Sequence, residues 1–394
     1  MKLLHVTHSL DPAVGGPAEC IRQMSLAALA DGNDITIACL DDPAAPWLQD
    51  YPLPVHGCGP PRAGSYGYAP ALWPWLLAHA PAADMLVAHG LWQYNGSAVR
   101  RVARRLGRPY AIFPHGMLDP WFRRSHPGKH MKKLAYWLTS ERANVRAAAA
   151  LLFTAEEERL LARGTFPFYR ATERVVGLGT AAPPADAELQ RAHFLQRFPQ
   201  LAETRNLLFL GRIQAKKGCD LLIEAFAAAG RGRDDLRLVM VGPDQQGWRA
   251  ELERLAEARG VGAHLVWTGM LQGVEKWGAF RACEAFALPS HQENFGVAVA
   301  EALACGLPVL ISDRINIWRE VVGDGAGLVA HDDLPGTRSL LARWYALSGA
   351  ERQAMGAAAR RCFANRYEIR SSTRRLMAVL GELAGTAALA GAAP

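Results

Sequence analysis

Two glutamates, Glu293 and Glu301, stand on either side of a run of small and apolar residues. A strand pattern ends just before Glu293, and the run from Phe295 is typical of a helix that Gly306 and Pro308 would stop. The opening of a helix offers unpaired backbone N–H groups and the positive end of its dipole, which suits a phosphate. The spacing therefore predicts an anion site at a strand-to-helix turn, with one acid before the helix and one about a turn inside it.

The residues of this turn could together bind a nucleotide diphosphate sugar. Gly296 would let a phosphate approach the backbone closely. A carboxylate at Glu301 can accept hydrogen bonds from a vicinal diol such as a ribose, and Glu293 is free to hold hydroxyls of a second ring. The alternative is that Glu293 caps a helix and Glu301 is a solvated surface acid. That alternative does not account for strand, turn, glycine and Gly-Leu-Pro following one another in this order.

Two cations, Arg212 and Lys217, follow the first strand pattern of the second half of the chain. A nucleotide diphosphate leaving group gains negative charge as the glycosidic bond breaks, and a metal or protein cations must stabilise it. No Asp-x-Asp stands at a predicted strand end to hold a metal. We therefore expect no metal and no other cofactor, with the arginine fork and the lysine charge neutralising the diphosphate.

Two features of the first half also suit a substrate site. Gly15 and Gly16 lie between the first strand and the first helix, where glycine lets a substrate meet the backbone, although a plain turn explains them nearly as well. His115 directly follows a strand pattern and can bond a sugar hydroxyl. Asp119 is the nearest acid that could take a proton from an acceptor.

Positive charge is concentrated in one stretch of a chain whose net charge is +7. Twelve Lys and Arg residues lie between Arg100 and Arg146, against two acids, and aromatic residues are interleaved with them. This pattern suits an anionic bilayer or a nucleic acid, and a solvated helix face is the plain alternative. We expect a membrane face that receives a lipid-diphosphate acceptor, formed by Trp121, Arg123, Arg124, Lys129, Lys132 and Lys133.

Short apolar strands alternate with helical patterns, and the alternation restarts after residues 180–184. A chain of 394 residues exceeds what one hydrophobic core usually serves, and strands separated by helices imply parallel sheets. The sequence predicts an α/β protein with two Rossmann-like, doubly wound parallel-sheet domains, residues 1–182 and 183–370, and then a helix with a frayed tail in 371–394. The predicted strands are 3–7, 35–39, 85–88, 110–113, 206–210, 236–241, 265–268, 285–289 and 308–312, and the main predicted helices are 16–30, 97–106, 219–229 and 248–258.

Composition excludes several classes of protein. Half of the residues are hydrophobic and 21% are charged, which is ordinary for a globular α/β protein. Seven cysteines without a Cys-x-x-Cys pair suit neither a disulfide framework nor a zinc site. The N-terminus is typical of a strand rather than a secretory signal, and the longest apolar run is far shorter than the roughly 20 residues of a membrane span. We expect a cytoplasmic protein that contacts the inner face of the plasma membrane peripherally.

The order of these motifs over nearly the whole chain resembles the family 4 glycosyltransferases, which are retaining enzymes of the GT-B fold. The resemblance implies two domains facing a central cleft, with a C-terminal helix near residues 374–383 that returns to the first domain. It implies transfer of a sugar from a GDP- or UDP-sugar to a saccharide acceptor, with Glu293, His115, Arg212 and Lys217 as the catalytic residues. The donor-binding residues that it implies are Gly15, Gly16, Arg212, Lys217, Glu293, Asn294, Phe295, Gly296, Val297 and Glu301.

The resemblance has one departure and leaves two alternatives. Where many relatives carry a Gly-Gly-x-x-Glu turn, this chain has residues 315–320, Ile-Asn-Ile-Trp-Arg-Glu, so that side of the pocket is expected to differ in shape. The run from His115 to Trp121 is similar to the branch that builds bacterial exopolysaccharide or capsule on lipid carriers. The alternatives are a sugar-nucleotide 2-epimerase of the same architecture and a basic nucleic-acid-binding protein.

Overall fold

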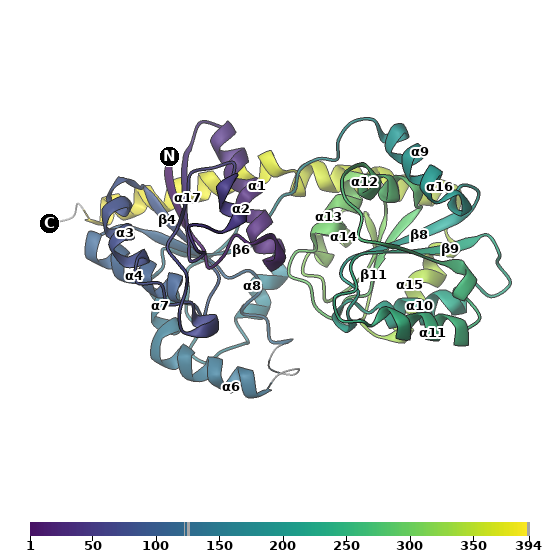
Figure 1. The fold of residues 1–394 in the computed structure, drawn as a ribbon, viewed down its shortest axis with the longest axis horizontal. Helices are drawn as coiled ribbons and strands as arrows, with labels where there is room; N and C mark the ends of the chain where they lie inside the picture. The colour runs from purple at the N-terminus through teal and green to yellow at the C-terminus, as the bar shows by residue number, and fades with distance from the viewer. Residues whose placement is uncertain (122, 124–126, 392–394) are drawn as a thin grey trace. The chain divides into compact units, whose positions relative to one another are not determined.

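The computed structural model describes residues 1–121, 123 and 127–391, and the chain divides into two compact units (Figure 1). Unit 1 combines Met1–Thr180 with the chain from Ile369 onward, and unit 2 is Ala181–Glu368. The divisions fall two residues before the boundaries expected after residues 182 and 370.

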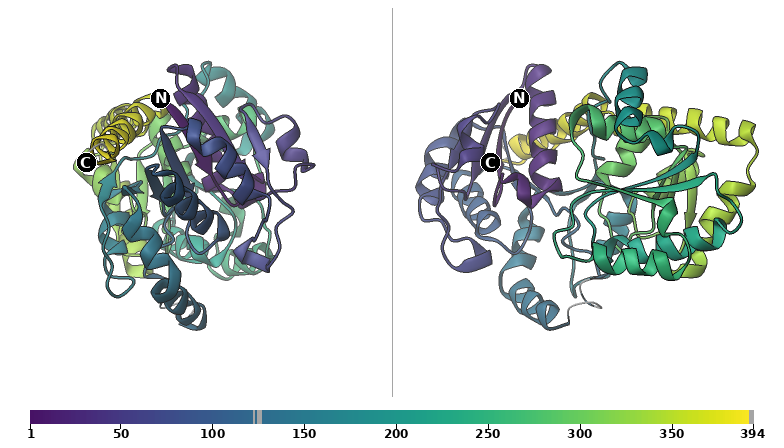
Figure 2. Two further views of the ribbon diagram at one scale, coloured as in Figure 1. Left: turned by 90° about the vertical axis from the view of Figure 1, so that its left-hand side faces the viewer. Right: turned by 45° about the vertical axis from the view of Figure 1, so that its right-hand side comes forward.

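Unit 1 is a seven-stranded parallel sheet with the strand order β3-β2-β1-β4-β5-β6-β7 and helices on both faces (Figures 1 and 2). Its strands are β1 Lys2–Val6, β2 Asp34–Cys39, β3 Val55–Gly57, β4 Met85–His89, β5 Tyr110–Phe113, β6 Ala150–Phe153 and β7 Glu173–Val175. Its helices are α1 Gly16–Ala30, α2 Pro46–Gln49, α3 Leu72–His79, α4 Tyr94–Leu106, α6 Pro127–Tyr136, α7 Arg142–Ala147, α8 Glu156–Ala162 and α17 Ile369–Gly391.

Side chains that alternate along the strands divide the core of unit 1 into two layers. Leu4 of β1 belongs to the layer that contains the buried faces of α3 and α4. Leu3 belongs to the other layer, with Ile21 of α1 and Leu380 of α17. His5 therefore lies on the α1 and α17 face, because successive side chains of a strand point to opposite faces. Each buried aliphatic side chain contributes about 2 kcal/mol, so the apolar face of α17 holds this helix in unit 1.

The C-terminal helix is longer than the sequence indicated. We expected a helix over residues 374–383 and fraying from Leu383, but α17 runs from Ile369 to Gly391. Alanine has the highest helix propensity, and the alanine-rich composition of this segment favours continued helix.

Unit 2 is a six-stranded parallel sheet with the strand order β10-β9-β8-β11-β12-β13, again with helices on both faces (Figure 2). Its strands are β8 Arg205–Leu210, β9 Leu236–Val241, β10 Leu265–Gly269, β11 Ala285–Leu288, β12 Val309–Ser312 and β13 Gly327–Ala330. Its helices are α9 Ala187–Arg197, α10 Cys219–Ala229, α11 Arg249–Ala258, α12 Gly273–Ala282, α13 Val297–Ala304, α14 Trp318–Gly323, α15 Leu334–Ala346 and α16 Gly349–Cys362.

The two strand orders confirm the predicted α/β class with two doubly wound parallel sheets. The sequence missed four strands. β3, β7 and β13 are edge strands of three or four residues, and β6 is an interior strand of four residues, so all four are too short for a clear periodicity. The seven cysteines are buried free thiols, as the absence of a pairing pattern predicted. Among the described residues, every helix is too short or too polar to span a bilayer.

Each sheet has one point at which the strand order reverses, between β1 and β4 in unit 1 and between β8 and β11 in unit 2. Ligands of open parallel sheets bind beyond the carboxyl ends of the strands at such a switch point, because the connections leave in opposite directions there. Gly15 follows β1, Lys217 follows β8 and Glu293 follows β11, so the predicted residues lie at the switch points of their own units.

Candidate functional site

The turn before α13 requires glycine. Gly296 is the residue before the helix and has φ +75° and ψ 68°, in the left-handed region. A Cβ at this position would lie 3.1 Å from Cγ2 of Val299 and 3.3 Å from Cγ2 of Ile315. The amide of Val299 donates to the carbonyl of Gly296 at 2.8 Å, which closes the first turn. The N–H groups before it have no acceptor within the helix, so the start of α13 can receive an anion.

The loop after β8 is pressed against the loop after β11. Gly218 has φ +66°, and a Cβ there would come within 2.3 Å of the carbonyl oxygen of Pro289, so only glycine permits this approach. The amide of His291 and the hydroxyl of Ser290 both donate to the carbonyl of Lys216, at 2.8 and 3.0 Å. These contacts hold both neighbours of Lys217 and so fix the position of Lys217.

Lys217 and Glu293 form an ion pair, with 13% and 23% of their side chains exposed. Glu293 was predicted to hold hydroxyls of a second ring, and any such hydroxyl would meet a carboxylate that is already paired with Lys217. Arg212 lies exposed in the loop after β8, and no hydrogen bond or ion pair within residues 1–121, 123 and 127–391 holds its guanidinium. Of the two predicted cations, Lys217 is thus paired with Glu293, and Arg212 has no hydrogen bond or ion pair with either residue in the described part of the chain.

Glu301 is a buried carboxylate rather than a surface acid. Only 8% of the residue is exposed, and Nζ of Lys276 on α12 donates to its Oε1 at 2.7 Å. The same ammonium lies 4.4 Å from the ring centre of Trp277. The surface alternative for Glu301 is thus wrong, and Lys276 is a charged neighbour that the sequence did not reveal.

The residues next to Glu293 are held by the loop after β12. The amide of Asn316 donates to the carbonyl of Glu293 at 3.1 Å, and its side-chain amide donates to Oδ1 of Asn294 at 3.2 Å. Asn316 is 1% exposed and belongs to the run that departs from the pattern of the resembling family. Phe295 packs edge-on against Tyr367, with ring centres 5.6 Å apart, so its side chain serves the core. Val297 is the first residue of α13.

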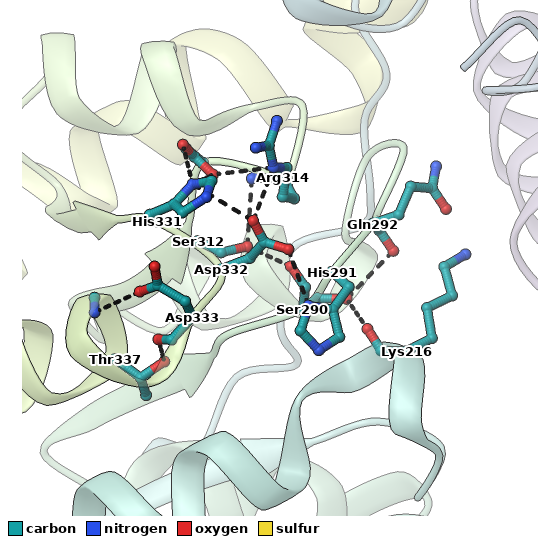
Figure 3. Close-up of polar contacts among 12 residues, drawn as sticks. Lys216, Ser290, His291, Gln292, Ser312, Arg314, His331, Asp332, Asp333 and Thr337 are labelled. Atoms are coloured by element: carbon teal, nitrogen blue, oxygen red, sulfur yellow. Dashed lines mark hydrogen bonds and ion pairs between the residues drawn. The ribbon is translucent and has the colours of Figure 1, made fainter. Parts of the chain in front are cut away.

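A charged network joins the ends of β12 and β13 to the loop after β11 (Figure 3). Asp332 lies 2.9 Å from Nε of Arg314 and 2.9 Å from Nδ1 of His291. Burial alone would raise the pKa of Asp332, but these hydrogen bonds lower it below its ordinary value. The hydrogen bond with Asp313 raises the pKa of His331. The network braces the loop that carries Glu293.

Asp313, His331 and Asp332 are also metal-type ligands whose atoms lie within 4.8 Å of one another. Nε of Arg314 lies 3.4 Å from Asp313 and 2.9 Å from Asp332. A divalent cation would have to displace this guanidinium, so the cluster fits a salt-bridge network better than a metal centre.

Three histidines of unit 1 form a hydrogen-bonded chain at the ends of neighbouring strands. Nδ1 of His5, one residue before the end of β1, lies 2.9 Å from Nε2 of His89, the last residue of β4. Nδ1 of His89 lies 3.0 Å from Nε2 of His115, just after β5. Phe113 stacks on His89 and His115, with ring centres 5.4 and 5.5 Å away.

Burial keeps the three histidines uncharged at neutral pH. Desolvation lowers the pKa of His5 and of His115 to about 4, and the pKa of His89 well below 6.5. A neutral imidazole carries one N–H, so the chain has two consistent proton arrangements, which run in opposite directions. In one of them Nδ1 of His115 donates a hydrogen bond, and in the other it accepts one. Either state suits contact with a sugar hydroxyl.

The backbone at His115 is held in an unusual conformation. His115 and Gly116 have φ values of +49° and +75°. The amide of Gly116 donates to Oε1 of Glu158 at 2.6 Å, and the amide and hydroxyl of Thr154 both donate to Oε2 at 2.8 Å. A non-glycine residue with positive φ costs on the order of 1 kcal/mol and persists where its surroundings enforce it, which is common at functional sites. The buried carboxylate of Glu158 supplies that enforcement.

Of the other predicted residues in unit 1, Gly15 and Gly16 lie in open surroundings, whereas Asp119 is buried. Gly15 has φ +86° and precedes α1, and a Cβ at Gly15 or Gly16 would meet nothing within 4 Å. The backbone at these glycines is thus open to a ligand. Asp119 is 8% exposed and its Oδ1 accepts the amide of Trp121 at 2.7 Å, so this acid stabilises a turn.

The predicted basic face is only partly exposed. Arg123, Lys129 and Lys132 are exposed, whereas Lys133 is half-buried, with its ammonium 5.2 Å from the ring centre of Trp92. Burial also lowers the pKa of Lys133. Because Lys133 is half-buried, it contributes less to an open charged surface. Trp121 is half-buried, and Arg124 lies outside the described residues.

Sequence reasoning missed His5, His89, Glu158 and Lys276. His89 did carry a signal, because it directly follows an apolar strand pattern, whereas His5 lies inside one. Their meeting depends on β1 and β4 being neighbours, which local patterns do not state. Glu158 and Lys276 have ordinary helical positions and no signal of their own.

Two protein-family models match the chain, one in each half. The model "Glycosyl transferase 4-like domain" matches residues 15–179, and the model "Glycosyl transferases group 1" matches residues 194–361. These ranges contain Gly15, His115, Arg212, Lys217, Glu293 and Glu301.

Two curated relatives and one solved structure illustrate the similarity. The phosphatidyl-myo-inositol mannosyltransferase of Mycobacterium leprae is 33% identical over 140 residues, 35% of either chain. The GDP-mannose:cellobiosyl-diphosphopolyprenol alpha-mannosyltransferase of Xanthomonas campestris is 24% identical over 343 residues, 84% of either chain. The HepE protein of Anabaena, solved in complex with UDP and glucose, superposes on this chain with a TM-score of 0.74 at 17% identity. The match covers 97% of this chain and all of the HepE chain, and it shows a similarity of fold. The matched part of this chain spans only 35% and 39% of the length of the first curated relatives.

Proposed function

Because the chain belongs to the glycosyltransferase family that these two models describe, and has the two-sheet architecture of the GT-B fold, we propose that it transfers a sugar from a nucleotide diphosphate sugar to a saccharide acceptor. The proposed donor is a GDP- or UDP-sugar, since one relative is named for GDP-mannose and one structural neighbour holds UDP with glucose. The proposed acceptor is a saccharide on a polyprenyl diphosphate, in the assembly of an extracellular polysaccharide.

The convergence of two loops at the switch point of unit 2 carries this proposal. The loops after β8 and β11 join Lys217 to Glu293 beside the glycine that opens α13. In the proposal the donor diphosphate lies at the start of α13, where Lys217 and Arg212 neutralise it. Glu301, held by Lys276, accepts the ribose hydroxyls, and Glu293 holds hydroxyls of the transferred sugar.

The proposed reaction keeps the anomeric configuration. The bond from the anomeric carbon to the phosphate oxygen breaks, and the acceptor oxygen bonds to that carbon on the same face. The acceptor proton passes to the departing phosphate oxygen, so Asp119 is not required as a base. Lys217, Arg212 and the amides around Gly296 stabilise the departing charge without a metal or another cofactor, while His115 bonds a sugar hydroxyl.

The test compares Lys217→Met and Glu293→Gln with Arg231→Gln, which removes an exposed cation after α10. Thermal shifts with GDP and UDP first identify the donor base, since a ligand of the folded state raises its melting temperature. We expect kcat to fall by about 100-fold or more in Lys217→Met and Glu293→Gln and to stay unchanged in Arg231→Gln.

Several outcomes would overturn the proposal. Unchanged turnover in both Lys217→Met and Glu293→Gln would refute their roles. Inversion at the anomeric carbon, read from the product by NMR, would refute retention. Loss of activity with EDTA that Mg²⁺ restores would refute the metal-free step. Isomerised donor without acceptor, and without free nucleotide diphosphate, would identify an epimerase.

We further propose that the basic face of unit 1 contacts an anionic membrane. Arg123, Lys129 and Lys132 are exposed, and Met131 beside them is 62% exposed. Cations around an exposed apolar side chain suit an anionic bilayer surface. Cosedimentation with phosphatidylglycerol vesicles, and not with phosphatidylcholine vesicles, is expected at low salt and should be lost in Lys129→Glu with Lys132→Glu. Equal binding to both lipids would refute the electrostatic contact.

A further inference from the structure

The three histidines His5, His89 and His115 meet edge to edge, as true hydrogen bonds between imidazoles require. Their bonded nitrogens are 2.9 and 3.0 Å apart, and the corresponding ring centres are 5.1 and 5.2 Å apart. A ring nitrogen lies about 1.1 Å from its ring centre, so an in-line N–H···N bond of this length separates two ring centres by roughly 5.2 Å. Each proton of this histidine chain is therefore shared between two particular nitrogens.

The backbone around the histidine chain is held by buried side chains. The side-chain amide of Asn95, which is fully buried, donates to the carbonyl of His89 at 2.9 Å and to the carbonyl of Val6 at 3.4 Å. It thereby links the ends of β4 and β1. At the other end, Glu158 accepts the amide of Gly116 at 2.6 Å. The three rings are thus held in one arrangement by the ends of the strands that carry them.

The two ends of the histidine chain have different surroundings. His5 is 1% exposed, and its Nε2 has no hydrogen-bond partner within residues 1–121, 123 and 127–391. An N–H at this nitrogen would have no protein acceptor there and little more than a trace of contact with water. His115 is only half-buried, and its Nδ1 also has no partner in the described part of the protein. A ligand can therefore reach the histidine chain at His115.

This difference favours one direction for the protons. A buried N–H without an acceptor is rare in folded proteins, whereas an unused acceptor is tolerated more often. With a proton on Nε2 of every ring, His5 would carry such an N–H. With a proton on Nδ1 of every ring, His5 donates to His89 and His89 donates to His115. The unused N–H then lies at Nδ1 of His115, where a ligand can accept it.

We propose that His5 and His89 are positioning residues that hold the proton of His115 on Nδ1, so that His115 donates a hydrogen bond to its ligand. The hydrogen bond that one ring nitrogen makes decides which nitrogen carries the proton. In the proposed reaction the ligand atom is an oxygen of the transferred sugar, and this part rests on the proposed function. The position of the proton does not, because it is a property of the protein without substrate.

The first test reads the proton position in the full-length protein with ¹⁵N-labelled histidine. Burial lowers the pKa of all three rings, so at pH 7.5 each ring keeps one proton. The ¹⁵N shift then distinguishes a protonated from a bare ring nitrogen. We expect the form of His115 with the proton on Nδ1 to exceed the other form about tenfold or more. Exposed His193 of α9 is the reference for an unconstrained ring. A proton on Nε2 of His115, or an even mixture, would overturn the inference.

Two substitutions of His89 separate its two hydrogen bonds. The side-chain amide of Asn reaches about as far as Nδ1 of histidine, so His89→Asn keeps a donor for His115. The amide of Gln reaches about as far as Nε2, so His89→Gln keeps a partner for His5 and removes the donor to His115. Both variants lose the same ring, and each is the control for the other. We expect the proton of His115 to stay on Nδ1 in His89→Asn and to leave it in His89→Gln. Equal proton positions in the two variants would overturn the role of His89.

A kinetic arm separates this inference from the proposed function. With sugar donor and saccharide acceptor, His89→Gln should lower kcat/KM by about tenfold, whereas His89→Asn should stay within about twofold of the unmodified protein. Equal values of kcat/KM in the two variants would refute a role of His89 in the transfer. If the unmodified protein transfers no sugar while the proton lies on Nδ1 of His115, the proposed function is refuted and the positioning of the proton stands.

Discussion

The buried histidine chain predicts that unit 1 loses stability on mild acidification. His5 and His115 have a pKa of about 4 in the folded protein against 6.5 in the unfolded chain, and burial is the cause. As the pH falls below 6.5 the unfolded state takes up protons that the folded state refuses, so the free energy of unfolding falls. The loss begins near pH 6.5 and is complete once the pH has fallen below about 4.

The magnitude follows from these two values. One such histidine lowers the free energy of unfolding by about 2 kcal/mol at pH 5 and by about 3 kcal/mol at pH 4, relative to neutral pH. His5→Gln removes one titrating group and keeps a side chain that can bond His89. At pH 7 we expect the variant to be about 1 kcal/mol less stable than the unmodified protein, because a hydrogen bond is altered. Between pH 7 and pH 5 the free energy of unfolding of the variant should fall by about 2 kcal/mol less than that of the unmodified protein.

The assay is urea unfolding at a series of pH values, fitted separately for each unit because a chain with two units need not unfold in one step. NMR titration of protein carrying ¹³C-labelled histidine reads each pKa directly. His193→Gln, which removes an exposed histidine of α9, is the control and should leave the pH dependence unchanged. The reasoning fails if His5 and His115 titrate near 6.5, or if His5→Gln and the unmodified protein lose equal stability between pH 7 and pH 5.

Three further predictions concern single side chains. Gly296→Ala places a Cβ 3.1 Å from Val299 at a backbone φ of +75°. We expect it to lower the free energy of unfolding by about 1 to 3 kcal/mol and to weaken nucleotide diphosphate binding. An unchanged melting temperature would contradict this prediction. Lys276→Met leaves Glu301 without its cation and should destabilise unit 2 by about 2 kcal/mol, as urea unfolding would measure, whereas Lys→Met at an exposed site should not. Glu158→Gln replaces a carboxylate that accepts three hydrogen bonds, and should speed hydrogen exchange of the Gly116 amide about tenfold or more; equal exchange rates would count against its role.

Much of the site in unit 2 could be predicted from the sequence because its signals are local. A strand pattern, a turn, Gly296 and an apolar run fix where α13 begins, and the helix start fixes where an anion can bind. The same alternation of strands and helices predicted both parallel sheets. The pairing of Lys217 with Glu293 was not predicted, since it depends on Gly218 meeting the carbonyl of Pro289.

By itself, then, the sequence determined the elements, the two α/β units and the residues that follow particular strands, because periodicity and turn chemistry act over a few residues. Only the tertiary structure decided which strand ends are neighbours. The order β1-β4-β5 brings His5, His89 and His115 into one chain, and the packing of α12 beside α13 gives Glu301 its cation. The physical reason is that the order of strands in a sheet is set by the packing of whole helices on its two faces, which no short stretch of residues encodes.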